Sequence, residues 1–229
     1  LQRVPDDRGS LAYRFIGGTT AEALAEQVRA ALDFAHQHHR LRQRWMRVLF
    51  IFDEAATLEW FRLPPAVRAA LEKESGDAVT LRKWNHIALE QRLQQHGKMA
   101  VERNISRLRN ELGGWPWLLD QLADSWGEAD DPLRNFDALV KRLRDGDLRQ
   151  PFLAATGCLV DKTARTVLQA FVHYDTVPVG DAVPGVLDDT LTSEACQTYV
   201  DYLQRLGLVE CDGESYRPDS VVGRLLPEP

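Results

Sequence analysis

A short apolar run followed by two acids, Arg47-Val-Leu-Phe-Ile-Phe52-Asp53-Glu54, constrains the fold more than any other part of the sequence. Its length suits a strand. Continuous rather than alternating apolarity is typical of a strand buried on both faces of a parallel α/β sheet. Asp53 and Glu54 then follow at the carboxyl edge of that sheet, where α/β folds bind ligands.

The residues before this strand complete a βαβ unit. We expect a strand over residues 11–16, a turn at Gly17-Gly18, and a helix that Thr19 or Thr20 caps and whose apolar positions recur at helical spacing as far as Ala35. A polar, basic stretch leads from there into the strand that ends at Phe52.

The middle of the chain changes character. Pro64-Pro65 opens a helix over residues 66–73, and residues 78–82 form one more short strand. Residues 83–150 then read as a small helical domain with a turn at Gly113-Gly114-Trp115-Pro116, and Asn135 or Asp137 caps its last helix.

The last third has the order of a winged helix-turn-helix. A helix over residues 162–171 precedes a connection rich in proline and glycine, and Thr192 caps a second helix that reaches Leu206. A hairpin follows, because Asp212-Gly213 is a dipeptide favoured at tight turns between strands.

The acids after the apolar strand suit phosphate chemistry. One carboxylate can hold a hydrated Mg²⁺, and its neighbour can polarise a water for attack on a γ-phosphate. The run resembles the Walker B motif of P-loop NTPases, in which an apolar strand ends in Asp-Glu. The alternative is an ordinary strand followed by an acid that caps a helix.

The turn at Gly113-Gly114-Trp115-Pro116 resembles the "GxP" element of the STAND class of AAA+-related ATPases. That resemblance implies a partial P-loop-type α/β core (1–82), a helical domain (83–150) and a winged helix (151–229). It also implies that Asp53 lies on the Mg²⁺ side, that Glu54 is the catalytic acid and that Pro116 contacts the nucleotide, with ATP or ADP and Mg²⁺ as cofactors of the intact protein. The alternative is that this stretch is only a turn between two helices, which the element of the class would also be.

Two departures from the class limit this expectation. The loop G-x-x-x-x-G-K-[ST] is absent, because the stretch from Gly17 to Thr20 has neither its spacing nor its lysine. A sensor arginine is not recognisable either, although Arg62 and Arg68 fall in the corresponding interval. We therefore expect either a piece of a longer protein with the loop upstream of Leu1 or a non-hydrolysing relative, and no ATPase activity from this chain alone.

Charge is distributed unevenly along the 229 residues. The whole chain has 28 basic and 34 acidic residues, but residues 151–229 have 5 basic and 12 acidic ones. Phosphate contacts need Lys and Arg on the docking face, so the winged helix is poorly suited to DNA and better suited to a protein partner. A basic excess over residues 82–109 is read as a solvated face, which could instead meet phosphates or an acidic partner.

The remaining composition indicates an ordinary soluble domain. With no membrane span and no signal peptide, we expect a cytoplasmic protein. The three cysteines are too scattered for a disulfide framework and are read as small buried hydrophobes, and the histidines at positions 36, 38 and 39 as a solvated helix end.

The leading functional hypothesis is a nucleotide-controlled switch that transmits its state to an effector, in signalling, transcriptional control or antiphage defence. A protein-interaction scaffold that keeps the fold without hydrolysis is the main alternative, and a winged-helix DNA-binding regulator is the weaker one.

Overall fold

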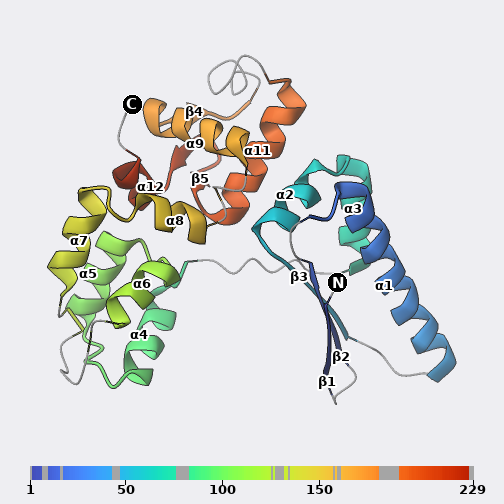
Figure 1. Ribbon diagram of the computed structural model, residues 1–229, viewed down its shortest axis with the longest axis horizontal. Helices are drawn as coiled ribbons and strands as arrows, with labels where there is room; N and C mark the ends of the chain where they lie inside the picture. Colours follow the sequence, from blue (N-terminus) through green and yellow to red (C-terminus); the bar gives the residue numbers. More distant parts are fainter. Residues whose placement is uncertain are drawn as a thin grey trace. The chain divides into compact units, whose positions relative to one another are not determined.

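A computed structural model describes most of the chain and divides it into two compact units, Leu1–Thr80 and Leu81–Pro229 (Figure 1). Each unit is described by itself. The described residues are 2–6, 10–15, 18–42, 47–75, 83–124, 126, 132–133, 135–156, 158, 161–180 and 191–226.

The first unit contains a three-stranded sheet in the order β1-β2-β3. Strand β1 (Gln2–Asp6) runs antiparallel to β2 (Ser10–Phe15), and β2 runs parallel to β3 (Arg47–Phe52). Helix α1 (Ala21–Arg42) connects the parallel pair, so the predicted βαβ unit is confirmed. Strand β1 was not expected from the sequence.

Three helices cover one face of this sheet. Helix α1 begins after Thr20, whose Oγ1 accepts a 3.4 Å hydrogen bond from the Ala23 N–H, as expected for an N-cap. It continues well past Ala35 through the basic stretch. Helices α2 (Glu54–Arg62) and α3 (Pro65–Ser75) pack beside it. Their shared core with the sheet contains Phe15, Leu24, Val28, Leu32, Ala56, Leu63 and Leu71.

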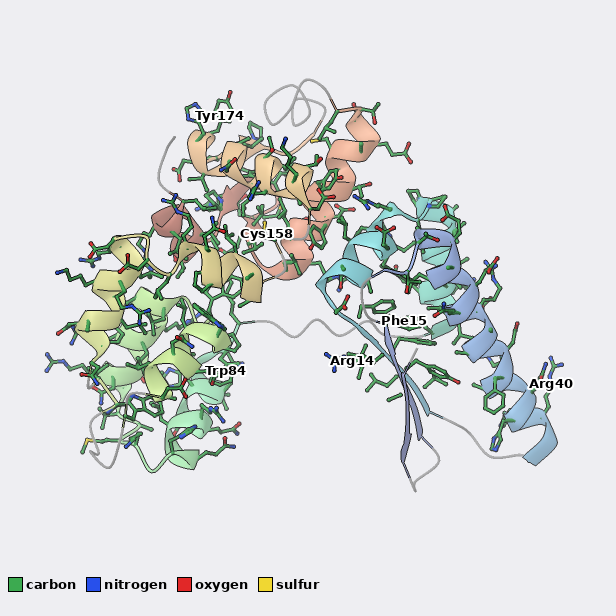
Figure 2. All side chains as sticks on the ribbon, viewed as in Figure 1. Arg14, Phe15, Arg40, Trp84, Cys158 and Tyr174 are labelled. Atoms are coloured by element: carbon green, nitrogen blue, oxygen red, sulfur yellow. The ribbon has the colours of Figure 1, made fainter. Side chains whose placement is uncertain are left out.

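Strand β3 is not buried on both faces, which corrects the expectation from its continuous apolar run. Phe50 and Phe52 pack against the helices, whereas Leu49 is 58% exposed and Ile51 is 41% exposed. Alternate side chains of a strand point to opposite faces, and α1, α2 and α3 cover only one of them. Figure 2 shows the same alternation on β2, where Arg14 and Phe15 point to opposite sides.

The second unit begins with helices that follow one another closely (Figure 1). Asn85 caps the first of them, since its Oδ1 accepts a 2.9 Å hydrogen bond from the Ala88 N–H. Asn135 stands at the N-cap position of the fourth but has φ of 60° and makes no side-chain cap bond, so neither residue proposed for that cap supplies one. The five helices are α4 (His86–Gln95), α5 (Glu102–Leu112), α6 (Pro116–Ala123), α7 (Phe136–Arg144) and α8 (Arg149–Ala155).

The rest of this unit combines helices with a small antiparallel sheet in the order β4-β6-β5. Thr192 caps α11 as expected, its Oγ1 accepting a 3.2 Å hydrogen bond from the Ala195 N–H. Strands β5 and β6 pair across Asp212-Gly213, so the predicted hairpin is confirmed. The elements are α9 (Lys162–Tyr174), β4 (Val177–Pro178), α11 (Ser193–Leu206), β5 (Val209–Cys211), β6 (Ser215–Pro218) and α12 (Ser220–Leu225).

Contacts join the helices of residues 83–150 to the C-terminal segment. Arg224 on α12 reaches α5, where its Nη1 lies 2.9 Å from Glu111 Oε2 and its Nη2 donates a 2.7 Å hydrogen bond to the Glu111 carbonyl. The Trp115 ring meets the Phe152 ring edge to face at 5.1 Å. These parts therefore fold as one compact unit, while the division into a helical and a winged-helix domain stays a prediction.

The expectations for the strand over residues 78–82 and for the cysteines have different outcomes. The strand predicted over residues 78–82 lies outside the described residues. Cys158 and Cys196 are buried as expected, but Cys211 is exposed on the hairpin, and all three are free thiols. Among the described residues, no helix combines the length and apolarity needed to cross a membrane.

Candidate functional site

The carboxyl ends of β2 and β3 meet at Asp53. Its N–H donates a 3.1 Å hydrogen bond to the Phe15 carbonyl at the end of β2. Its carboxylate is the N-cap of α2, where Oδ1 accepts a 2.8 Å hydrogen bond from the Ala56 N–H. The half-buried Asp53 thus occupies the sheet edge predicted for it, and it also does what the alternative interpretation required, since it caps a helix.

Glu54 is the first residue of α2, directly after Asp53. Its backbone therefore lies at the same edge of the sheet, while its side chain lies outside what the structure describes. For the proposed catalytic pair, the structure therefore gives the backbone position of both residues and side-chain contacts of Asp53 only.

The described part of the sheet edge shows Asp53 in a capping role, and the binding of ATP and Mg²⁺ there stays a prediction. One Asp53 oxygen already binds the start of α2, and no group of three or more His, Cys, Asp or Glu among the described residues could hold a metal ion. Thr20 serves as the cap of α1, and the first lysine of the whole chain is Lys73, on α3. The segment that follows β2 therefore supplies no lysine of the kind that a phosphate loop needs.

Gly113, Gly114 and Pro116 each have a structural role in the turn between α5 and α6. Gly113, with φ of 63°, ends α5, and Gly114, with φ of 72°, accepts a 2.7 Å hydrogen bond from the Trp84 N–H through its carbonyl. A Cβ on Gly114 would lie 2.4 Å from the Trp84 carbonyl oxygen, so only glycine fits. Pro116 is the first residue of α6, where its missing N–H costs nothing.

Asp53 and Glu54 belong to the first unit and Pro116 to the second. The structure therefore describes two separate predicted parts of a nucleotide site. One is a sheet edge with a capping carboxylate, and the other is a turn between helices.

A cleft of about 320 Å³ lies between α5 and α7, and no motif in the sequence indicates it. Its charged groups pair with one another, because Arg107 Nη2 lies 2.5 Å from Asp137 Oδ1 and Arg144 Nη2 lies 3.6 Å from Glu111 Oε2. Three basic and three acidic residues line the cleft, so it has no excess of either charge. Its lining residues are Arg107, Glu111, Phe136, Asp137, Val140, Lys141, Arg144 and Asp145.

Part of the basic excess over residues 82–109 is neutralised within the fold. Arg92 Nη2 lies 3.0 Å from Asp120 Oδ1, Arg107 pairs with Asp137, and Lys98 is buried beside the Trp126 ring. Lys98 therefore departs from the expected solvated face, and the interpretation of the remaining run stays a prediction.

Helix α11, which the sequence predicts to be the second helix of a winged helix, precedes the β5–β6 hairpin. It contains Glu194 and Asp201 and only one basic residue, Arg205. Because phosphate contacts need Lys and Arg, the prediction against DNA binding rests on this charge and stays a prediction.

Comparison of the chain with protein-family models, with curated proteins and with the solved structures finds no match.

Proposed function

We propose that this chain is a module of a nucleotide-controlled switch of the STAND type whose output is a protein partner or effector. The observation that supports it is the parallel β2–β3 pair with Asp53 and Glu54 directly after β3. Acids at this edge suit Mg²⁺ and the positioning of water, so ATP or ADP with Mg²⁺ is the proposed ligand of the complete site. Signalling, transcriptional control and antiphage defence in the cytoplasm are the settings that the resemblance implies.

The residues of this chain alone do not complete that site, because the sequence has no lysine-bearing phosphate loop. We therefore expect binding of ATP to require such a loop from additional sequence. The proposed contribution of the chain is the acidic edge in its first unit and the turn at Pro116 in its second. The second unit supports an output role, since its helical and C-terminal parts are tied together by contacts such as that of Arg224 with Glu111.

Calorimetry of the chain with ATP and Mg²⁺ tests the expectation that the chain alone does not bind ATP. We expect no heat of binding at micromolar concentrations, and micromolar affinity would contradict it. In a protein that joins this chain to a loop ending in Gly-Lys-Ser/Thr, Glu54→Gln should bind nucleotide without turnover, because the carboxylate that orients water is lost. Asp53→Ala should instead weaken Mg²⁺-dependent binding.

A matched control for these variants is Glu59→Gln, on α2 but away from the sheet edge and paired with Arg62 at 2.6 Å. It should leave binding and turnover unchanged. If the variants at positions 53, 54 and 59 all behave like the unmodified protein while ATP is hydrolysed, the catalytic pair lies elsewhere.

The second candidate function is a non-hydrolysing interaction scaffold, and the capping role of Asp53 favours it. In that case Asp53→Asn, which keeps the cap, should leave both the fold and partner binding intact, and no variant should alter nucleotide behaviour. The DNA-binding alternative is tested by a gel shift of the full chain at physiological salt, where the acidic C-terminal segment predicts no retardation of duplex DNA.

A further inference from the structure

A buried carboxylate, Asp219, joins three separate parts of the second unit. It is 3% exposed and caps α12, accepting hydrogen bonds at its Oδ1 from the N–H groups of Val221 at 2.9 Å and Val222 at 3.3 Å. The Trp115 indole N–H donates to the same oxygen at 3.0 Å. Its other oxygen, Oδ2, lies 2.6 Å from Lys83 Nζ.

Lys83 is held from several sides. Its Nζ lies 2.6 Å from Asp219 Oδ2 and 2.6 Å from Glu210 Oε1 on β5, and it stands over the Trp115 ring, 5.2 Å from the centroid. Glu210 is 57% exposed, so one side of this ammonium group reaches solvent while the other faces a buried carboxylate.

The next residue, Trp84, is bound to the same turn by its backbone. Its N–H donates to the Gly114 carbonyl at 2.7 Å, and its carbonyl lies so close to Gly114 that no side chain fits there. Lys83 and Trp84 are the first described residues after the boundary between the two units. The first described residues of the second unit therefore lie against the turn that contains Pro116 (Figure 2, where Trp84 is labelled).

We propose that Lys83 and Asp219 form an electrostatic clamp that couples the first described residues of the second unit, Lys83 and Trp84, to the turn formed by residues 113–116. Withdrawal of Lys83 removes the charge partner of Asp219 and the cation over Trp115, so that Trp84, the Trp115 indole and the first turn of α12 loosen together. Lys83 and Asp219 are thus positioning residues for the turn. This clamp goes beyond the proposed function and operates whether or not a nucleotide binds.

The opening is local because α12 has a second attachment. Arg224 binds the Glu111 carboxylate and carbonyl on α5 without contacting Lys83 or Asp219. Helix α12 therefore stays docked when the clamp opens, and only its first turn is released.

Hydrogen exchange of the full chain, followed by NMR, tests the clamp through Lys83→Met, which keeps most of the alkyl stem and removes the charge. We expect the Trp84 amide, the Trp115 indole N–H and the Val221 amide to exchange about tenfold faster, all by a similar factor. Amides in the interior of α5 and α9, such as those of Leu108 and Leu168, should keep their rates.

Three further variants keep the test decisive. Arg107→Met removes an arginine that pairs with Asp137 and stands over the Phe136 ring at 4.8 Å, and it should leave the three clamp signals unchanged. Glu210→Gln, at an exposed site, should accelerate the same three signals by a smaller factor even if Lys83→Met does not fold. Lys83→Arg, which keeps the positive charge, should keep the slow exchange of the unmodified protein.

Exchange that rises equally at Leu168 and at the three clamp signals would show that Lys83 contributes only to overall stability. Unchanged clamp signals in Lys83→Met, or signals that respond independently of one another, would also overturn the proposal.

Discussion

The indole nitrogen of Trp115 lies 3.0 Å from Oδ1 of Asp219, 104 residues further along the chain. Trp115 belongs to the turn between α5 and α6, and Asp219 caps the last helix. This one hydrogen bond ties the helical part of the second unit to its C-terminal end. Its carboxylate acceptor is buried, so the loss of the donor is costly.

We predict that Trp115→Phe lowers the free energy of unfolding by about 1.5–3 kcal/mol more than Trp117→Phe does. Both rings meet Phe152 edge to face, at 5.1 and 6.2 Å, and phenylalanine keeps an aromatic ring at either position, although Trp115 is the more buried of the two and also lies under Lys83. Only Trp115 donates to Asp219. Denaturant unfolding measures the difference, and equal losses would mean that the hydrogen bond contributes little.

A second prediction concerns the close approach of Gly114 to Trp84. Gly114→Ala should destabilise the protein by about 1–3 kcal/mol more than Gly97→Ala, because a Cβ at position 114 displaces backbone. The φ angles of the two glycines are similar, 72° and 65°, and a Cβ on Gly97 meets nothing within 4 Å. Thermal or denaturant unfolding of the two variants therefore separates the cost of the clash with Trp84 from the cost of placing alanine in a left-handed conformation, which both variants share.

The exposed face of β3 gives a third prediction. Leu49→Ala should change the free energy of unfolding by less than about 1 kcal/mol, because this side chain is already 58% exposed. Leu24→Ala removes the same atoms from a fully buried site and should cost about 2–5 kcal/mol. Sedimentation of Leu49→Ala also shows whether this face promotes self-association. Similar losses for the two variants would contradict the observed exposure.

The thiols give a fourth prediction. Burial raises the pKa of Cys158 to about 12, so almost no thiolate forms there at pH 8, whereas Cys211 is exposed. A thiol reagent should therefore modify one cysteine rapidly in the folded protein and the other two only after unfolding. Cys211→Ser should remove the rapid phase. A rapid phase that persists in this variant would show that a buried thiol becomes accessible without unfolding.

The sequence predicts much of the regular structure because local rules determine it. The change from strand to helical periodicity after Gly18 and the caps at Thr20 and Thr192 are read within a few residues. Strand β1 escapes prediction, since Gln2–Asp6 has one clear apolar residue and a proline, a composition tolerated at the edge position that it occupies.

The long-range features could not be predicted in the same way. The Lys83–Asp219 pair spans 136 residues, and nothing near either residue indicates the other. The burial of β3 also depends on which helices pack against the sheet rather than on the strand itself. Its apolar run is the same whether one face or both are covered, which is why Leu49 and Ile51 were expected inside.

The final prediction separates the two roles of Asp53. As the N-cap of α2, its Oδ1 accepts from the Ala56 N–H, and an asparagine side chain can do the same. Asp53→Asn should therefore leave the free energy of unfolding nearly unchanged, whereas Asp53→Ala should lower it by about 0.5–2 kcal/mol. If Asp53 also binds Mg²⁺, the ion should stabilise the unmodified protein and not Asp53→Asn, because a neutral amide is a poor substitute for a carboxylate at a divalent cation. Unfolding curves of the two variants, recorded with and without Mg²⁺, provide the measurement. Should Asp53→Asn lose as much stability as Asp53→Ala, the negative charge rather than the capping bond stabilises this edge of the sheet.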